Sequence, residues 1–322
     1  MPGSSISIVK ASFIIPSYQL SKYMHRVVDS ICAQSFAHDS FEVIIVDNNP
    51  NTNDISDWVN NNSGKYKTTI KCVKEPNIGL HNARHAGCRA ASAPILCFVD
   101  DDACIDPYYL NHILDCFADE NVGIIGGRVI LVWEMQPAEW VLKMNLRGNF
   151  GEMDLGTTSF DLPAYEGVSG ASFSIRKNLV FDLGGFNPGR FGDVNKPWLR
   201  CDSEGGLCFK AHVRKITIRY CADALAYHQI PENRLKLDYI RKRLTWTAFG
   251  ATYSNLKRYG MNYFVICFLI VGRLAKYLGN FGLGKHRWAK RHYELSCILY
   301  LFRLLFCIEM RKQILRDDFI ND

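Results

Sequence analysis

The sequence predicts an α/β fold built on a mainly parallel sheet, followed by a basic helical region. Short apolar runs alternate with segments of helical periodicity through the first half of the chain, as when helices connect parallel strands. The run Glu42–Asp47 is almost wholly apolar, which is typical of a strand buried on both faces. The chain of 322 residues is 48% apolar and 22% charged, a globular composition that excludes intrinsic disorder.

The first strand is expected at Ser12–Tyr18 and the first helix at Ser21–Gln34, where Met24 and Ile31 share one helical face. Ser21 is suited to cap that helix because its hydroxyl can accept from a free backbone N–H. Pro107 stands where a helix can begin. Further strands are expected at Thr69–Val73, Ile95–Val99, Val122–Val129 and Lys215–Tyr220, and further helices at His81–Ala91 and Pro107–Ala118.

Two long irregular stretches, Trp133–Pro163 and Asn187–Asp202, interrupt this alternation. Loops of that length in a compact domain are usually lids or binding loops, so we expect substrate specificity to reside there. The opening MPGSSISIVK lacks the charged and apolar regions of a signal peptide. Together with twelve cysteines and no Cys-x-x-Cys pair, this predicts a cytoplasmic protein with reduced thiols and excludes a secreted disulfide scaffold.

Positive charge is concentrated at the C-terminal end. From Pro231 onward there are 17 Lys or Arg against 7 Asp or Glu, a net of +10, whereas the first 230 residues carry −4. The stretches Tyr263–Gly272 and Leu295–Ile308 are apolar but shorter than the roughly 20 residues that span a bilayer. We therefore expect peripheral attachment to the anionic inner membrane surface and no nucleic-acid partner. The alternative is that both stretches pack against the preceding α/β domain and leave a solvated basic face.

Three carboxylates, Asp100, Asp101 and Asp102, follow the apolar run Ile95–Val99. Side chains alternate along a strand, so Asp100 and Asp102 can point the same way at the carboxyl end of the sheet, where ligands bind in α/β proteins. Carboxylate oxygens are preferred ligands of Mg²⁺ and Mn²⁺, which bridge to diphosphates. The acidic run therefore predicts a divalent metal site.

Several blocks resemble the family-two nucleotide-sugar glycosyltransferases, which have the GT-A fold. The blocks are SFIIPSYQLSKYMHRVVDSICAQSF (Ser12–Phe36), FEVIIVDNN (Phe41–Asn49) and EPNIGLHNARHAGCRAASAPILCFVDDDACIDPYYL (Glu75–Leu110). Weaker blocks follow, namely GVSGASFSIR (Gly167–Arg176), GGFN (Gly184–Asn187) and YHQIPENRL (Tyr227–Leu235). The order and spacing of the blocks carry the resemblance, which extends over roughly residues 10–235.

The resemblance implies a site for a nucleotide-sugar donor and a divalent metal, Mn²⁺ or Mg²⁺. Tyr18 would cover the base and Asp47 would accept from a base N–H, while Arg84 would donate two N–H groups to a phosphate. Asp102 would bind the metal directly, and His228 would close the site near the diphosphate. The implied donor-binding residues are Pro16, Tyr18, Asp47, Asn48, Asn77, Gly79, Arg84, Asp100 and Asp101, and the metal-site residues are Asp102, Asp100 and His228.

The general base is where the chain departs from its family. The family pattern is Glu-Asp shortly before an apolar helix, and the matching stretch here is CDSEGGLC (Cys201–Cys208). Counting back from Leu207, Glu204 falls at the base position and Ser203 at the usual Glu. A glutamate can accept the proton of an acceptor hydroxyl as an aspartate does. Asp202 is the competing base if the loop is shifted by two residues.

The resemblance implies an inverting, metal-dependent glycosyltransferase that moves a sugar from a nucleotide diphosphate donor, UDP by family habit, to a glycan or lipid-linked saccharide. Residues 1–232 would form the catalytic domain, with a donor half of about 1–129 and an acceptor half of about 130–232, and residues 233–322 the helical extension. The alternative is a catalytically weak homologue that acts as a nucleotide-sugar-binding scaffold in polysaccharide assembly. A nucleotidyltransferase is disfavoured because the N-terminal segment lacks a Gly-rich phosphate loop.

Overall fold

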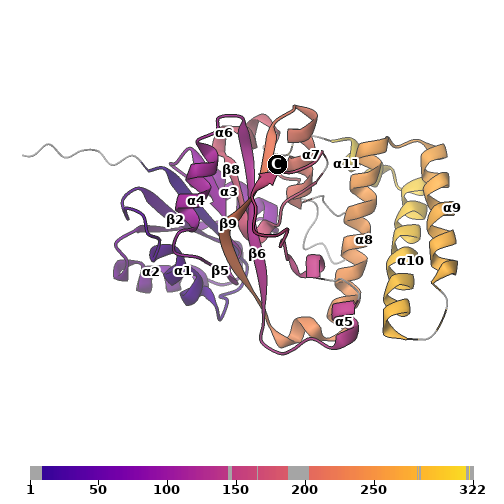
Figure 1. The fold of residues 1–322 in the computed structure, drawn as a ribbon, viewed down its shortest axis with the longest axis horizontal. Coiled ribbons are helices and arrows are strands. Elements are labelled where there is room, and N and C mark those ends of the chain that lie inside the picture. The colour runs from indigo at the N-terminus through magenta and orange to yellow at the C-terminus, as the bar shows by residue number, and fades with distance from the viewer. Residues whose placement is uncertain are drawn as a thin grey trace, which may run out of the picture.

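The computed structural model describes residues 9–143, 147–164, 166–187, 203–280, 282, 284–316 and 319. In these residues a large sheet flanked by helices is followed by a group of long helices (Figure 1). The strands are β1 (Ala11–Ser17), β2 (Phe41–Asp47), β3 (Thr69–Lys74), β4 (Ile95–Phe98), β5 (Ala103–Ile105), β6 (Val122–Trp133), β7 (Phe160–Asp161), β8 (Phe173–Arg176) and β9 (Thr217–Ile230). The helices of the sheet region are α1 (Met24–Cys32), α2 (Asp54–Asn62), α3 (Leu80–Ala90), α4 (Tyr109–Phe117), α5 (Glu139–Lys143), α6 (Lys177–Asp182) and α7 (Ser203–Val213).

The strands form one nine-stranded sheet in the order β3-β2-β1-β4-β8-β6-β9-β5, with β7 paired to β9. Strands β3, β2, β1 and β4 run parallel to one another, and β6 and β9 form a second parallel pair. Strand β8 joins the two sets and runs antiparallel to both β4 and β6. This mixed α/β architecture, together with the helical C-terminal region, confirms the predicted fold class.

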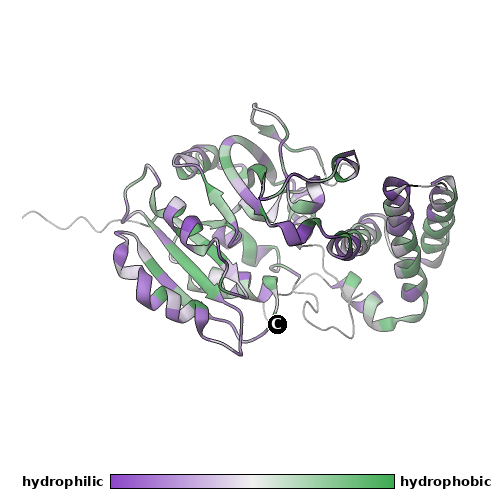
Figure 2. Cartoon of the chain, turned by 90° about the horizontal axis from the view of Figure 1, so that it is seen from below, coloured by the Kyte–Doolittle hydropathy of each residue, from purple (hydrophilic) through white to green (hydrophobic). Residues whose placement is uncertain are grey.

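The core lies on both faces of the parallel strands. Every residue of β1 and of β2 is buried, as the apolar sequence of the second strand predicts, and the strands are mostly green in Figure 2. Helix α1 turns Met24, Val27, Val28 and Ile31 onto this sheet, which is the helical face expected from their spacing. The carboxyl ends of the parallel strands consequently meet at one edge, where the polar loops begin.

The expected strands and helices are all present, but two strands run further than their local sequence predicts. Strands β6 and β9 pair with each other from Val122 to Trp133 and from Thr217 to Ile230, because each supplies the hydrogen-bonding partners of the other. Helix α2 was not expected, since DISDWVNNN is rich in polar residues and buries only one side. The stretch Trp133–Pro163, expected to be irregular, contains α5, β7 and a 3-10 helix at Arg147–Phe150.

The described residues of the C-terminal region form four α-helices, which agrees with the helical character expected of this region. They are α8 (Leu237–Tyr259), α9 (Tyr263–Gly279), α10 (Lys285–Phe306) and α11 (Ile308–Leu315), and the first three stand beyond one side of the sheet (Figure 1). A cluster that includes Leu131 and Ile230 at the strand ends and Ile240 on α8 joins them to the sheet. Among the described residues no helix combines the length and apolar content needed to cross a membrane.

Glu42, at the start of β2, is a buried carboxylate that ties three strands together. One oxygen, Oε1, accepts from the Ser12 hydroxyl on β1 at 2.7 Å and from the Ser92 backbone N–H before β4 at 2.6 Å. The other oxygen pairs with Lys71 Nζ on β3 at 2.6 Å. Burial raises the pKa of Glu42, but these donors outweigh it and lower the pKa to about 2.

We expect Glu42→Gln to lower the free energy of unfolding by about 3 kcal/mol near pH 7, the order given by the pKa shift. The depressed pKa stabilises the fold above the unfolded value of 4.5, and this contribution is lost as the pH falls toward about 2. Urea denaturation at several pH values checks the prediction. The exposed Glu120→Gln is the matched control, and an equal effect of the two substitutions would contradict it.

Candidate active site

The acidic run Asp100–Asp102 lies just beyond the carboxyl end of β4. This strand is parallel to β1 on one side and antiparallel to β8 on the other. After Asp102 the chain enters the short strand β5, which pairs antiparallel with β9 so that Ala103 faces His228. The Gln229 backbone N–H donates to the carbonyl oxygen of Asp102 at 2.8 Å. This strand register brings together residues more than one hundred positions apart in the sequence.

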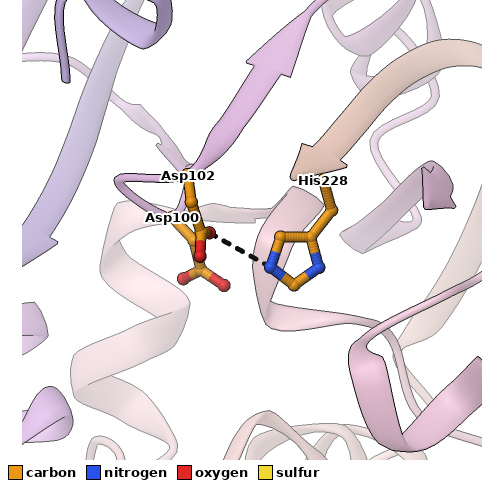
Figure 3. A group of neighbouring side chains, drawn as sticks. All are labelled: Asp100, Asp102 and His228. Carbon is orange, nitrogen blue, oxygen red and sulfur yellow. Dashed lines mark ion pairs between the residues drawn. The ribbon is translucent and has the colours of Figure 1, made fainter. Parts of the chain in front are cut away.

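Asp100, Asp102 and His228 form a group in which one ligand atom from each lies within 4.8 Å of the others (Figure 3). His228 Nε2 is 3.1 Å from Asp102 Oδ1. Burial raises the pKa of Asp102, but the hydrogen bond and charge of His228 and the charge of Arg234 lower it below its usual value. Two carboxylates and an imidazole are ligands suited to Mn²⁺, and the residues therefore fit a divalent cation.

Arg234 lies beside the same group and was not singled out by the sequence analysis. Its Nη2 donates to Asp102 Oδ2 at 2.6 Å, and its Nη1 lies 3.3 Å from His228 Nε2. The signal for it was its place in the block YHQIPENRL, six residues after His228. A guanidinium in this position balances the negative charge of Asp102 and can also reach an anionic ligand.

Asp101 points away from this group and toward the end of β1. Its carboxylate accepts a hydrogen bond from the Ser17 hydroxyl, whose oxygen also lies 3.0 Å from the carbonyl oxygen of Gln19. Burial and the neighbouring charges of Asp102 and Asp100 raise the pKa of Asp101 to about 7. The middle residue of the acidic run thus fastens β4 to the loop after β1.

Glu204 lies in the first turn of α7, and its carboxylate pairs with the buried guanidinium of Arg84 on α3. The guanidinium lies over the rings of Phe98 and Phe186, 5.7 and 5.4 Å from their centroids. Arg84 Nη2 is also 3.9 Å from Asp100 Oδ1. Arg84, which was predicted to contact a phosphate, therefore connects the candidate base to the acidic group.

Gly170 is a second residue that sequence reasoning missed. A Cβ atom at this position would overlap the carboxylate of Glu204 and lie 2.7 Å from Arg84 Nη2. The ion pair between Glu204 and Arg84 thus requires a glycine at position 170. The signal was the block GVSGASFSIR, in which only spatial packing distinguishes Gly170 from Gly167.

The remaining predicted donor-binding residues lie at or just beyond the carboxyl ends of β1, β2 and β3. Asn48 connects the loops that follow β2 and β3. Its Nδ2 donates to the Asn77 carbonyl at 2.8 Å, and its Oδ1 accepts from the Gly79 N–H at 2.7 Å. Gly79 has a φ of 146°, in the region that favours glycine. Pro16 is buried within β1 and Tyr18, just beyond it, is exposed.

Asp47 occupies a different environment from the one expected for a base-contacting carboxylate. It is fully buried and accepts from Ser56 Oγ at 2.8 Å, Lys74 Nζ at 2.9 Å and the Asn49 N–H at 3.1 Å. Burial raises the pKa of Asp47, but these donors lower it below its usual value. Its carboxylate holds the loop after β2, and contact with a nucleotide base stays a prediction.

Asp202 lies outside the described residues, as do residues 188–201 of the expected specificity loop.

The comparisons with known proteins agree with this arrangement. The family model described as Glycosyl transferase family 2 matches residues 12–178, more than half of the chain. The chain belongs to glycosyl transferase family 2. This family-2 glycosyltransferase is similar to glucosyl-dolichyl phosphate glucuronosyltransferase of Haloferax volcanii, with 23% identity over 261 residues that cover 77% of this chain and 78% of the relative.

Among solved structures, this glycosyltransferase is similar to residues 1–349 of S. aureus TarS. The TM-score is 0.53 and the sequence identity 14%, over 93% of each chain. The same TarS region in complex with UDP and with UDP-GlcNAc also matches, each with a TM-score of 0.51. At this identity the likeness shows the fold, and it confirms the expected GT-A fold.

We expect Gly170→Ala to lower turnover of a nucleotide-sugar donor by about tenfold or more, because the added methyl group displaces the carboxylate of Glu204. Gly167→Ala is the matched control, since its Cβ meets only the Gly205 backbone at 3.8 Å. Donor hydrolysis measures the effect, and circular dichroism verifies folding of both variants. Equal activity of the two variants would show that the position of Glu204 is unimportant.

Proposed function

We propose that this family-2 glycosyltransferase transfers a sugar from a UDP-sugar to a hydroxyl group of a glycan or lipid-linked saccharide, with inversion at the anomeric carbon. The observation that carries the proposal is the single buried network in which Arg84 connects Glu204 to Asp100, next to Asp102 and His228. A carboxylate suited to accept a proton thus lies beside a group suited to a metal diphosphate. The TarS complexes with UDP and UDP-GlcNAc support the choice of nucleotide.

In the proposed mechanism, Glu204 accepts the proton of the acceptor hydroxyl, whose oxygen then attacks the anomeric carbon opposite the leaving diphosphate. Arg84 orients the Glu204 carboxylate through their ion pair. Asp100, Asp102 and His228 would hold a Mn²⁺ or Mg²⁺ ion, which when bound neutralises charge on the nucleoside diphosphate. Arg234 adds a fixed positive charge beside that group.

The proposal also includes the acceptor and the location. The Haloferax volcanii relative, which covers most of this chain, carries a dolichyl phosphate in its name. A lipid-linked acceptor agrees with the net charge of +10 after residue 230, which favours the anionic cytoplasmic face of a membrane. In this proposal residues 1–232 form the catalytic domain, with donor and acceptor halves meeting near residue 129, and residues 233–322 attach it peripherally to the membrane.

We expect Asp102→Ala to lower the rate of sugar transfer by about 10²-fold or more, because it removes one of the proposed metal ligands. The wild type should lose activity in EDTA and regain it with Mn²⁺. Titration calorimetry of Mn²⁺ in the presence of UDP provides the second readout. Full activity without any metal would exclude the proposed role.

We expect Glu204→Gln to lower turnover by about 10²-fold while leaving the affinity for UDP nearly unchanged, because the amide cannot accept the proton. Single-turnover kinetics and UDP titration separate the two effects. If Asp202→Asn is the more damaging substitution, Asp202 is the base. If the wild type binds UDP but turns over no donor of a nucleotide-sugar panel, the chain is a scaffold homologue.

A further inference from the structure

Helix α9 exposes an apolar stripe on the side that faces away from the rest of the protein. Phe264, Phe268, Val271 and Leu278 are 89%, 78%, 65% and 61% exposed. Their spacing of four, three and seven residues places them on one face of the helix. The opposite face of α9 is also apolar and is buried through Ile266 and Ile270.

Helix α10 repeats this pattern. Leu295, Leu299, Phe302 and Phe306 are all exposed and lie four, three and four residues apart on one face. The buried face of α10 contributes Tyr300, Leu301 and Leu304 to a cluster shared with α8, α9 and α11. The C-terminal helices therefore already have a core, and the two exposed stripes lie outside it.

We call these eight exposed side chains the apolar hairpin surface. A helix of a soluble protein normally exposes charged or polar residues opposite its buried face. Here that position is held by large apolar side chains on each of two adjacent helices, and exposed apolar area of this kind marks an interaction site. The helical end of the molecule in Figure 2 accordingly shows green segments on its outer helices.

The charges of the sequence segment that forms the apolar hairpin surface indicate the chemistry of its partner. Residues 257–306 contain nine Lys or Arg and a single acidic residue, Glu294. Glu294 is buried and paired with Arg273 at 3.0 Å, so it does not offset the positive charge at the surface. Lys276, Lys285 and Lys290 are exposed on the same two helices. Positive charge repels a second copy of this surface and attracts anionic lipid headgroups.

We infer that the apolar hairpin surface inserts into the interfacial layer of an anionic bilayer, with the net positive charge of the same two helices drawing them to the headgroups. Neither helix is long and apolar enough to span a membrane, so this insertion is partial, with the helix axes along the membrane plane. The inference deepens the proposed function and rests on it only for the reason why the enzyme needs a membrane. The attachment itself depends on the chemistry of α9 and α10.

Co-sedimentation of the full chain with vesicles tests the inference. We expect the wild type to bind vesicles of phosphatidylcholine and phosphatidylglycerol, and to bind pure phosphatidylcholine vesicles more weakly. The double variant Phe264→Ser/Phe268→Ser should reduce partitioning by about tenfold or more, because two inserted rings are lost. Leu155→Ser/Val213→Ser is the matched control, since both residues are exposed but belong to the sheet region.

Salt dependence separates the two components of binding. The triple variant Lys276→Gln/Lys285→Gln/Lys290→Gln should weaken binding to the anionic vesicles at low salt and remove most of its salt sensitivity. Binding by the wild type that is equal for both vesicle types would overturn the role of charge. Recovery of the wild type in the supernatant with both vesicle types would overturn the inference as a whole.

A second copy of the chain is the competing occupant. If light scattering shows a wild-type dimer that Phe264→Ser/Phe268→Ser converts into a monomer, the surface is a self-interface and the inference is wrong. UDP binding and donor hydrolysis, measured in solution for the same variants, should stay at the wild-type level. A failed glycosyltransferase assay with intact vesicle binding would contradict the proposed function and leave the membrane surface established.

Discussion

Charge balance among buried carboxylates is the constraint on which the site depends. The acidic run after β4 and Glu204 on α7 bring four carboxylates to one edge of the sheet, where uncompensated charge would cost several kcal/mol per group. Two arginines and a histidine supply the compensation. Arg84 serves Glu204 and Asp100, while Arg234 serves Asp102 together with His228. The site therefore holds its shape through ion pairs that connect α3, β4, α7, β9 and the turn after β9.

This balance has a consequence for ligand binding. Arg234 donates to Asp102, a member of the group that fits a divalent cation, and its second Nη lies near His228. A cation and a guanidinium placed on the same carboxylate would repel each other, so in the proposed function a bound metal diphosphate would draw Arg234 toward the phosphate oxygens. Arg84 differs, because the rings of Phe98 and Phe186 pack against its guanidinium and Gly170 leaves room for it.

The C-terminal helices combine buried contacts within the protein with exposed apolar side chains. They pack onto the strand ends through Leu131, Ile230 and Ile240 and also form a core of their own. Of the two accounts that the sequence left open, packing of both apolar stretches against the catalytic domain is not what the described residues show, because their buried faces pack on α8 and α11. Attachment of the exposed faces to a membrane stays a prediction. What the packing leaves uncovered on α9 is as apolar as what it covers.

The sequence alone determined the strand–helix alternation, the buried second strand, the acidic run and the basic helical end, because each depends on residues close together in the chain. The full lengths of β6 and β9, the insertion of β8 between β4 and β6, and the approach of His228 to Asp102 depend on strand pairing between distant segments. Local periodicity carries no information on such pairing. The same holds for Arg84, whose spacing indicates only a helical charge. Its contact with Glu204, 120 residues away, exists because the fold brings α3 next to the first turn of α7. Which basic side chains pair with these carboxylates was therefore decided by the tertiary structure, since ion pairing depends on distance in space.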